Sequence, residues 1–335
     1  RLLLSFVSLL FCLLGATEVR AQDYVGLWNF DEGNLSSSSG EDMEYLDDTG
    51  DIAEFGTTES FGVPAINGEI ANVLKLPKLT PEQGLLINLP EGESNGGGDL
   101  VNNWTAIMDI YHPATSSGKK RALIEIVTGE WVAGADDAEF YVSANNAIGT
   151  AGFEVGTLTP GEWHRVAIVM NVEGASEGLG FGRVYIDGNY AGGTAVQADS
   201  LDGRWSLDTL FNLTLSLFQD DNNESEEVVV NSVQLRFEAL NAGQIGALGG
   251  AQAAGVPKKL PDVPSFVTGW TPSAAYANAD TVLGVVVDSG DTDIGKNSFS
   301  LSLNGELIPS EVTEDGGVFT VKASGDVALE KASKY

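Results

Sequence analysis

The chain has 335 residues with 17 basic and 48 acidic side chains, so its formal net charge is −31 at pH 7. A field this negative repels phosphate groups and anionic lipid headgroups, which argues against a nucleic-acid or membrane-surface partner. The single cysteine, Cys12, and the two histidines, His112 and His164, exclude a disulfide framework and a zinc site rich in Cys and His. A hydrophobic fraction of 43% suffices for packed cores, and the length predicts about two domains.

Residues 1–21 are typical of a secretory signal peptide. Arg1 precedes a short apolar run, and Val19 and Ala21 occupy positions −3 and −1 of a cut after Ala21. The run is shorter than the roughly 18–20 apolar residues that a transmembrane helix needs. We therefore expect an exported mature chain, secreted or held at the cell surface, that contains no cysteine.

From residue 22 to about residue 240 the pattern is β throughout, with runs rich in β-branched and aromatic residues between Gly, Asn, Asp or Pro. Asp187-Gly188 predicts a tight hairpin, because this pair tolerates a positive φ. Asn241, with Gln244 three residues later, predicts the capped start of one short helix. Many runs are apolar on both faces, which predicts a two-sheet sandwich with covered sheets. The predicted strands span residues 24–30, 71–76, 104–112, 122–127, 139–143, 163–172, 182–186, 210–218 and 228–237.

Four segments carry a family resemblance, and they occur in the expected chain order. They are Gly-Leu-Trp-Asn-Phe-Asp-Glu-Gly at 26–33, Leu-Thr-Pro-Gly-Glu-Trp-His-Arg-Val at 158–166, Val-Tyr-Ile-Asp-Gly at 184–188, and the closing strand and short helix at 233–248. Together they resemble the laminin G-like, concanavalin A-like jelly-roll domains of secreted bacterial proteins over residues 22–248. The resemblance implies a jelly-roll sandwich that binds glycans or other extracellular ligands, often with calcium.

A second unit follows a change in composition. Residues 249–264 are rich in Gly, Ala and Pro without periodicity, which predicts a linker that acts as a hinge. Residues 265–335 resemble bacterial immunoglobulin-like spacer domains, with Asn304-Gly305 as a hairpin turn. A complete domain of that kind has about 100 residues in seven strands. We therefore expect a smaller, incomplete immunoglobulin-like β-sandwich in a chain truncated at both ends.

No catalytic residue is predicted. His164 lies inside a predicted strand and His112 precedes Pro113, so both are expected to be structural rather than part of a Ser-His-Asp system. Glycosidases on concanavalin-like sandwiches carry two carboxylates that face each other across a cleft. Asp109 and Glu125 are isolated, and we expect both to face solvent.

Two acidic segments predict a calcium site, because calcium takes about six to eight oxygen ligands. One segment follows the opening strand and the other occupies residues 219–224. In the family's jelly roll the first and last strands are antiparallel neighbours, which would bring the two segments together. The alternative is that both are solvated turns. The candidate ligands are Asp31, Glu32, Asp220, Asp221, Asn223 and Glu224.

Two loop tryptophans, Trp131 and Trp205, are the candidate ligand-binding residues, because a sugar ring stacks on an exposed aromatic face. The alternative is burial under a neighbouring loop. Trp28, Trp104 and Trp163 lie on predicted strands and are expected in the core.

The expected function is a non-catalytic extracellular binding or adhesion module that recognises a polysaccharide or cell-surface glycan as part of a larger exported protein. Two alternatives stay open. The region could target a secreted hydrolase whose catalytic domain lies downstream, or the sandwich could itself be a glycan hydrolase or lyase.

Overall fold

The structure is a computed structural model that describes residues 24–126, 139–150, 153–173, 180–196, 201–220, 222–271, 282–303 and 306–324. The predicted signal peptide, Trp131, Asp221 and the Asn304-Gly305 turn lie outside these residues. Strands dominate the described part, as predicted, and its one α-helix is α1 (Ala242–Leu248). No helix in these ranges is long and apolar enough to cross a membrane.

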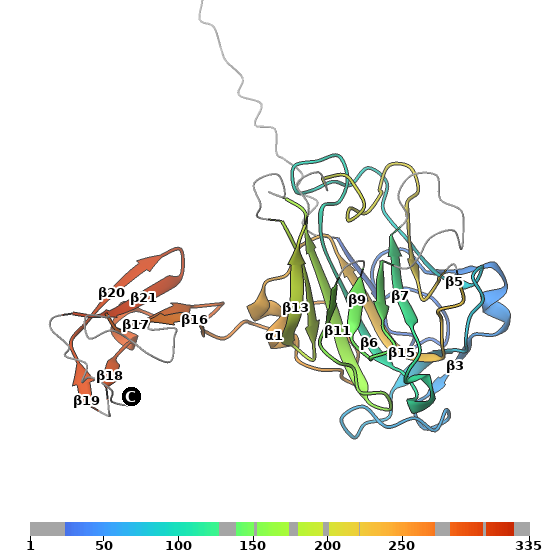
Figure 1. Cartoon of the computed structure of the whole chain (residues 1–335), viewed down its shortest axis with the longest axis horizontal. Coiled ribbons are helices and arrows are strands. Elements are labelled where there is room, and N and C mark those ends of the chain that lie inside the picture. The colour runs from blue at the N-terminus through green and yellow to red at the C-terminus, as the bar shows by residue number, and fades with distance from the viewer. Residues whose placement is uncertain are drawn as a thin grey trace, which may run out of the picture.

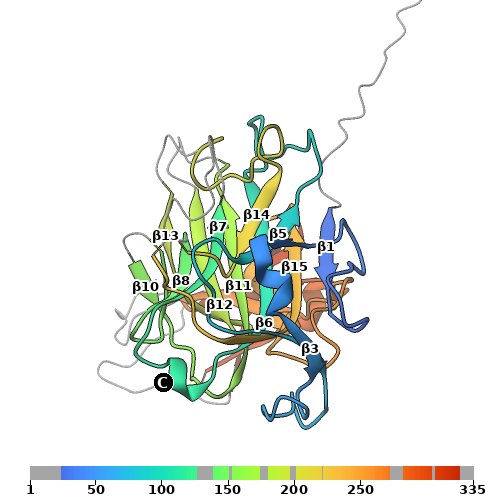
Figure 2. The ribbon, with the colours of Figure 1, turned by 90° about the vertical axis from the view of Figure 1, so that its right-hand side faces the viewer.

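Two antiparallel sheets stack as a β-sandwich (Figures 1 and 2). Sheet A contains β1 (Val25–Trp28), β3 (Glu54–Thr57), β4 (Asn72–Leu76), β6 (Asn103–Tyr111), β11 (Trp163–Asn171), β12 (Phe181–Ile186), β13 (Asn189–Ala195) and β15 (Val228–Arg236). Its order is β13-β12-β11-β6-β15-β4-β3, and β1 also pairs with β15. The first strand is therefore the antiparallel neighbour of the last strand, as expected.

Sheet B faces sheet A and contains seven strands among the described residues. They are β2 (Glu44–Leu46), β5 (Gly84–Asn88), β7 (Arg121–Ile126), β8 (Phe140–Val142), β9 (Ile148–Thr150), β10 (Phe153–Val155) and β14 (Thr214–Leu217), in the order β10-β9-β8-β7-β14-β5-β2. Each of the nine predicted strands overlaps an observed one, but the strand predicted at residues 210–218 is only β14. Its first half is a turn, because the Asp208 carboxylate accepts the backbone N–H groups of Leu210 and Phe211.

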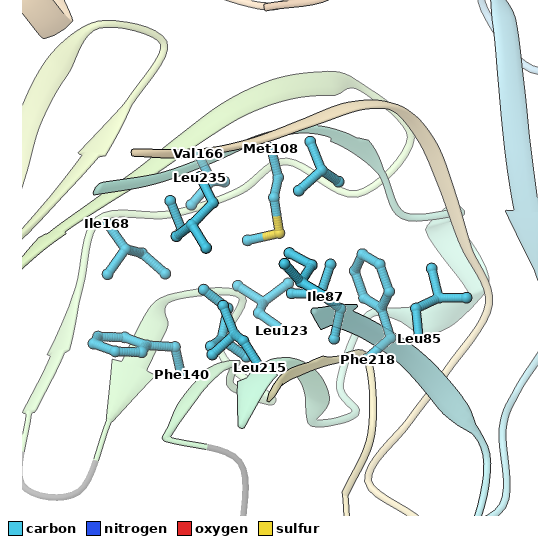
Figure 3. Packing of buried hydrophobic residues seen from close by; sticks show 14 of the residues in the cluster. Leu85, Ile87, Met108, Leu123, Phe140, Val166, Ile168, Leu215, Phe218 and Leu235 are labelled. Carbon is cyan, nitrogen blue, oxygen red and sulfur yellow. The ribbon is translucent and has the colours of Figure 1, made fainter. Parts of the chain in front are cut away.

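The main core fills the space between the two sheets. Figure 3 shows Met108, Val166 and Leu235 of sheet A pointing toward Ile87, Leu123 and Leu215 of sheet B. All six are buried, and alternate residues of each strand supply them because side chains alternate across a strand. Trp28 and Trp104 are fully buried in this core, as predicted.

The outer face of sheet A is also buried, which explains the runs that are apolar on both sides. Helix α1 packs over it and contributes Ile245 and Leu248 to a second apolar cluster. The capping box at Asn241 is complete: its side chain accepts from Gln244 N (2.9 Å), and the Gln244 side chain accepts from Asn241 N (2.8 Å).

The chain after α1, residues 249–258, continues across this outer face, and we name it the strap. Val256 of the strap is buried in the second apolar cluster. Side chains of β15 hold the strap backbone: Asn231 Nδ2 donates to Ala253 O (3.3 Å) and Gln234 Nε2 donates to Pro257 O (3.0 Å). The structure thus corrects the hinge prediction over the strap, which is packed and hydrogen-bonded. The division into domains at residues 22–248, 249–264 and 265–335 stays a prediction.

The glycines of the strap serve close packing. A Cβ at Gly250 would lie 3.2 Å from a carboxylate oxygen of Asp187. A Cβ at Gly188 would lie 3.1 Å from the Cα of Gly249. The Asp187-Gly188 turn, which joins β12 to β13 as predicted, therefore touches the strap backbone directly. Composition alone makes such glycines look like a flexible linker.

A buried ion pair lies beneath the strap. Arg165 donates two hydrogen bonds to Asp109, from Nε to Oδ1 and from Nη2 to Oδ2, both 2.7 Å long. The same guanidinium donates to Leu248 O (2.7 Å) and Gly255 O (3.2 Å). The prediction that Asp109 faces solvent is wrong, and so is that for Glu125, which is buried on the outer face of sheet B.

The remaining described strands form smaller sheets. A four-stranded sheet has the order β16-β17-β21-β20, and β18 pairs antiparallel with β19. In this part of the described chain, Phe319 and Val321 are the buried apolar side chains. The strands are β16 (Phe266–Thr271), β17 (Gly284–Asp288), β18 (Leu301–Leu303), β19 (Glu306–Ile308), β20 (Ser310–Asp315) and β21 (Val318–Ala323).

Replacing Arg165 with Met should lower the free energy of unfolding by about 3–5 kcal/mol, because it leaves the Asp109 carboxylate buried without its charge partner. Urea unfolding measures this loss. The matched control is Lys75→Met, which removes the partly exposed pair with Glu227 (3.5 Å) and should cost less than about 1 kcal/mol. Equal losses in the two variants would contradict the role given to the buried pair.

His112 predicts a specific pH dependence of stability. It is buried, and burial together with the nearby Arg121 charge lowers its pKa from 6.5 to about 3. The unfolded chain takes up this proton near pH 6.5 whereas the folded chain does not, so stability falls as the pH drops below 6.5. The loss is about 1.4 kcal/mol per pH unit, or about 2 kcal/mol between pH 6.5 and 5. His112→Asn should remove this part of the slope in urea unfolding; an unchanged slope would contradict it.

Candidate functional site

A cavity of about 310 Å³ opens where one edge of sheet A meets one edge of sheet B. We name it the edge cavity. The edge strands β13 and β10 come so close that a Cβ at Gly192 would lie 2.4 Å from a methyl group of Val155. Next to this contact, β8, β9 and β10 supply one wall and β11, β12 and β13 supply the other. The lining residues are Phe140, Thr150, Phe153, Met170, Gly182, Thr194, Ala195, Val196, Arg204 and Trp205.

Trp205 is held in this wall by contacts on several sides. Its ring packs against Phe140 with 5.8 Å between ring centroids, and its backbone carbonyl accepts from the Trp104 indole N–H (2.8 Å). The guanidinium of Arg204 lies 5.2 Å from the ring centroid. Because Trp205 is half-buried, part of its surface packs on the core and part lines the cavity. The loop tryptophan singled out from the sequence thus lies in a cavity wall.

Arg204 adds a charged group at the cavity. Its side chain is 51% exposed, and its Nε lies 3.3 Å from Oε1 of Glu139, which is nearly buried. The other oxygen of Glu139 accepts the backbone N–H of Ile126 (2.7 Å). Glu139 therefore positions Arg204, because its own carboxylate is fixed by the end of β7.

Thr150 supplies a polar group inside the cavity. It is 1% exposed, and its hydroxyl has no hydrogen-bond partner among the described residues. An unsatisfied buried hydroxyl costs about 1–3 kcal/mol. Because this oxygen has almost no exposed surface, a ligand hydroxyl could pair with it only after the Thr150 side chain turns toward the cavity. Sequence reasoning missed Thr150, because only the pairing of β9 with β10 turns its side chain inward.

Gly182 keeps space open in the wall formed by sheet A. A Cβ there would lie 2.9 Å from the sulfur of Met170, which also lines the cavity. Such a distance is shorter than real Cβ contacts, so any side chain at this position would have to displace Met170. The absence of a side chain at residue 182 therefore contributes to the cavity volume.

Among the described residues, the candidate calcium ligands of the two acidic segments are not brought together. β1 ends at Trp28, opposite Val233, and β4 pairs with Val228–Val230 of β15 instead. Asp31 lies beside Asn72 at the start of β4, where its carboxylate accepts from the Asn72 amide (3.1 Å). Four strand residues, or about 13 Å, separate this point from the end of β4 that pairs with Val228.

In the acidic loop, the Asp220 carboxylate accepts the backbone N–H groups of Asn222 and Glu224 and so closes a turn. Glu224 pairs with Lys120. Within the described ranges, no three His, Cys, Asp or Glu side chains form a group suited to a metal ion. Calcium binding, with Asp31, Glu32, Asp220, Asp221, Asn223 and Glu224 as ligands, stays a prediction.

The segment 158–166, which contains His164, has a structural role here. His164 Nε2 accepts the backbone N–H of Thr159 (2.9 Å), and its Nδ1 lies 2.7 Å from Asp187 Oδ2. Burial lowers the pKa of His164, but the hydrogen bond and charge of Asp187 outweigh burial, so the net shift is upward. His164 thus ties the loop before β11 to the hairpin after β12, as expected for a structural histidine.

Comparison with known proteins gives structural likenesses only. No family model and no curated protein matches the chain. Domain 4 of AbnA, a GH43 extracellular arabinanase from Geobacillus stearothermophilus solved with arabinotriose, is 15% identical with a TM-score of 0.39, over 66% of this chain and 95% of that one. The binding domain of Paraclostridial Mosquitocidal Protein 1 is 12% identical with a TM-score of 0.43, over 68% of this chain and 52% of that one.

The receptor-binding domain of botulinum neurotoxin type G is also 12% identical, with a TM-score of 0.39, over 88% of this chain and 64% of that one. At these identities and TM-scores the likenesses carry no argument about function. The all-β sandwich rests on the strand pairing of this chain itself.

Replacing Thr150 with Val should raise the free energy of unfolding by about 1 kcal/mol, because it removes the unpaired hydroxyl and keeps the side-chain shape. The matched control is the buried Thr105, whose hydroxyl donates to Glu238 O (2.7 Å) and accepts from Leu240 N (3.0 Å). Thr105→Val should instead lose about 1–3 kcal/mol. Thermal and urea unfolding measure both, and a comparable loss at residue 150 would show that its hydroxyl is paired.

Proposed function

We propose that this chain is a non-catalytic carbohydrate-binding module of the laminin G-like, concanavalin A-like kind, and that it binds one end or branch of a glycan in the edge cavity. The observation that carries the proposal is the combination of an aromatic wall with an unpaired hydroxyl. Trp205 and Phe153, which are both half-buried, offer apolar surface to the C–H groups of a sugar ring. Thr150 offers a hydroxyl that pairs with a sugar hydroxyl once its side chain turns toward the cavity.

The volume and lining of the cavity support binding of a small unit. A cavity of about 310 Å³ lies at the lower end of the range for small-molecule sites, which is about 300–1,000 Å³. The side chains described at this cavity include one cation, Arg204, and no carboxylate.

The wider proposal follows the resemblance stated from the sequence. The chain is an exported protein with a signal peptide at residues 1–21 and an immunoglobulin-like spacer at residues 265–335. It binds a polysaccharide or cell-surface glycan as part of a larger exported protein. A catalytic domain downstream would make it the targeting region of a secreted hydrolase.

The decisive variant is Trp205→Ala, tested first on a glycan array and then by calorimetry with the oligosaccharide that the unmodified protein binds best. The variant should weaken binding at least about tenfold, because it removes the stacking face; tenfold corresponds to about 1.4 kcal/mol. Its stability should fall by about 2 kcal/mol, since Trp205 is half-buried, so binding is measured well below its melting temperature. Thr150→Val should weaken binding without this loss of stability.

The matched control is Trp270→Ala, because Trp270 is 63% exposed on β16 and does not line the cavity. It should leave the affinity unchanged. Equal loss in the Trp205 and Trp270 variants would contradict the proposed site. Release of reducing sugar from the bound oligosaccharide would show that the chain is a hydrolase.

A further inference from the structure

A second concave site lies on the outer face of sheet A, and we name it the outer cleft. Its volume is about 360 Å³. Three distant parts of the chain build it: the turn at Asn67, the end of β12 at Asp187, and the strap at Gln252, with the first residue of β11, Trp163, between them. It shares no lining residue with the edge cavity.

Trp163 supplies an oriented aromatic ring to this cleft. The expectation that it belongs to the core is wrong, because it is half-buried on the outer face of sheet A. Its indole N–H donates to Pro64 O (2.7 Å), and its ring packs on Tyr111 with 5.6 Å between centroids. Two contacts therefore hold the ring while part of its surface stays accessible.

Asp187 supplies a fixed carboxylate that is 36% exposed. Its Oδ1 accepts the backbone N–H of Arg165 (2.9 Å), and its Oδ2 pairs with His164 Nδ1 (2.7 Å). A carboxylate offers about four acceptor positions, so each oxygen retains capacity for a ligand. The missing side chain at Gly250, whose Cβ would lie 3.2 Å from Oδ1, leaves this carboxylate approachable.

Two amides complete the polar part of the cleft. Asn67 has the positive φ of a tight turn (51°), and its Nδ2 donates to Ala251 O in the strap (2.9 Å). This hydrogen bond leaves its side-chain oxygen as an acceptor. The exposed amide of Gln252 can both donate and accept.

We propose that the outer cleft is a second carbohydrate subsite, specific for a neutral sugar unit. The lining of the cleft is mostly polar, largely acceptor groups, with a small apolar part to which Trp163 contributes. Its ligand must therefore present several hydroxyl donors and a small C–H surface. The charge of Asp187 disfavours an acidic sugar. The proposal does not depend on the edge cavity, because the two sites share no residue.

Two such subsites on one domain would bind a long or branched glycan more tightly than either alone, through effective concentration. The outer cleft also exists only when the strap is docked, since Gly250, Ala251 and Gln252 form one side of it.

The test is an NMR titration of the labelled full chain with the methyl glycosides of glucose, galactose, xylose and arabinose at millimolar concentrations. The Trp163 indole N–H resonance, assigned with the Trp163→Phe variant, should shift and saturate with at least one of these sugars. The resonance should shift to the same extent in Trp205→Ala, which separates this site from the edge cavity.

Gln252→Ala, at an exposed side chain, should bind these sugars about threefold more weakly through the loss of one hydrogen bond. Methyl glucuronide should bind more weakly than the glucoside.

A Trp163 resonance that stays fixed with all four sugars in the unmodified protein would overturn the second subsite. Loss of its shift in Trp205→Ala would show one shared site and would also overturn it. A glucuronide that binds as well as the glucoside would overturn the assignment to neutral sugars. If the sugars shift the Trp163 indole resonance but not that of Trp205, the outer cleft is supported and only the proposed site in the edge cavity is contradicted.

Discussion

Arg165 and Asp109 meet on the outer face of a sheet that is apolar on both sides, and this buried pair organises the chain segments above it. A sheet of this kind must be covered on its second face, and the chain covers it with α1 and the strap. The pair carries no net charge, but the guanidinium still needs acceptors for its remaining N–H groups. The carbonyls of Leu248 and Gly255 supply these acceptors. The guanidinium that neutralises Asp109 therefore also holds the end of α1 and the strap by hydrogen bonds. Breaking the pair would therefore also weaken the attachment of the strap to sheet A.

Both candidate sites follow from how the sandwich closes. The edge cavity forms where two sheets approach at β10 and β13 and glycine at residue 182 leaves room beneath Trp205. The outer cleft forms where the strap passes the Asp187-Gly188 turn closely enough to require glycine on both sides. The edge cavity is a gap between two sheets, and the outer cleft is a gap beside the strap that covers sheet A. The rigid elements around them fix the aromatic rings of Trp205 and Trp163 before a ligand arrives, which lowers the entropic cost of binding.

The pairing of first and last strands was an expectation from the family resemblance, whereas the sequence itself contained enough to predict the sandwich, the hairpin at Asp187 and the capping box at Asn241. These features depend on local chemistry: alternation of side chains, positive φ at a turn, and a side chain that reaches a nearby backbone N–H. Trp205 was correctly expected in a loop, because turn-forming residues precede it in the sequence; its role in ligand binding stays a prediction.

The remaining features depend on neighbours distant in the chain. The strap looked like a hinge, since a glycine required by close approach has the same composition as a flexible one. Asp109 looked solvent-facing because its partner, Arg165, is 56 residues away. The acidic segments at Asp31 and Asp220 were expected to converge, but β4 occupies the place beside β15 where they would have met. Within sheets A and B, five strands, β2, β3, β5, β9 and β10, were not predicted; all are three to five residues long, too short to show a clear period.

The central claim is that a sugar ring binds in the edge cavity against Trp205. A crystal structure of the chain with the oligosaccharide that it binds best tests this claim most directly. The account predicts a sugar ring packed on the Trp205 side chain, with one of its hydroxyls hydrogen-bonded to Thr150 Oγ1. An oligosaccharide bound on the outer face of sheet B, beside Tyr141 and Asn88 with the edge cavity empty, would contradict it.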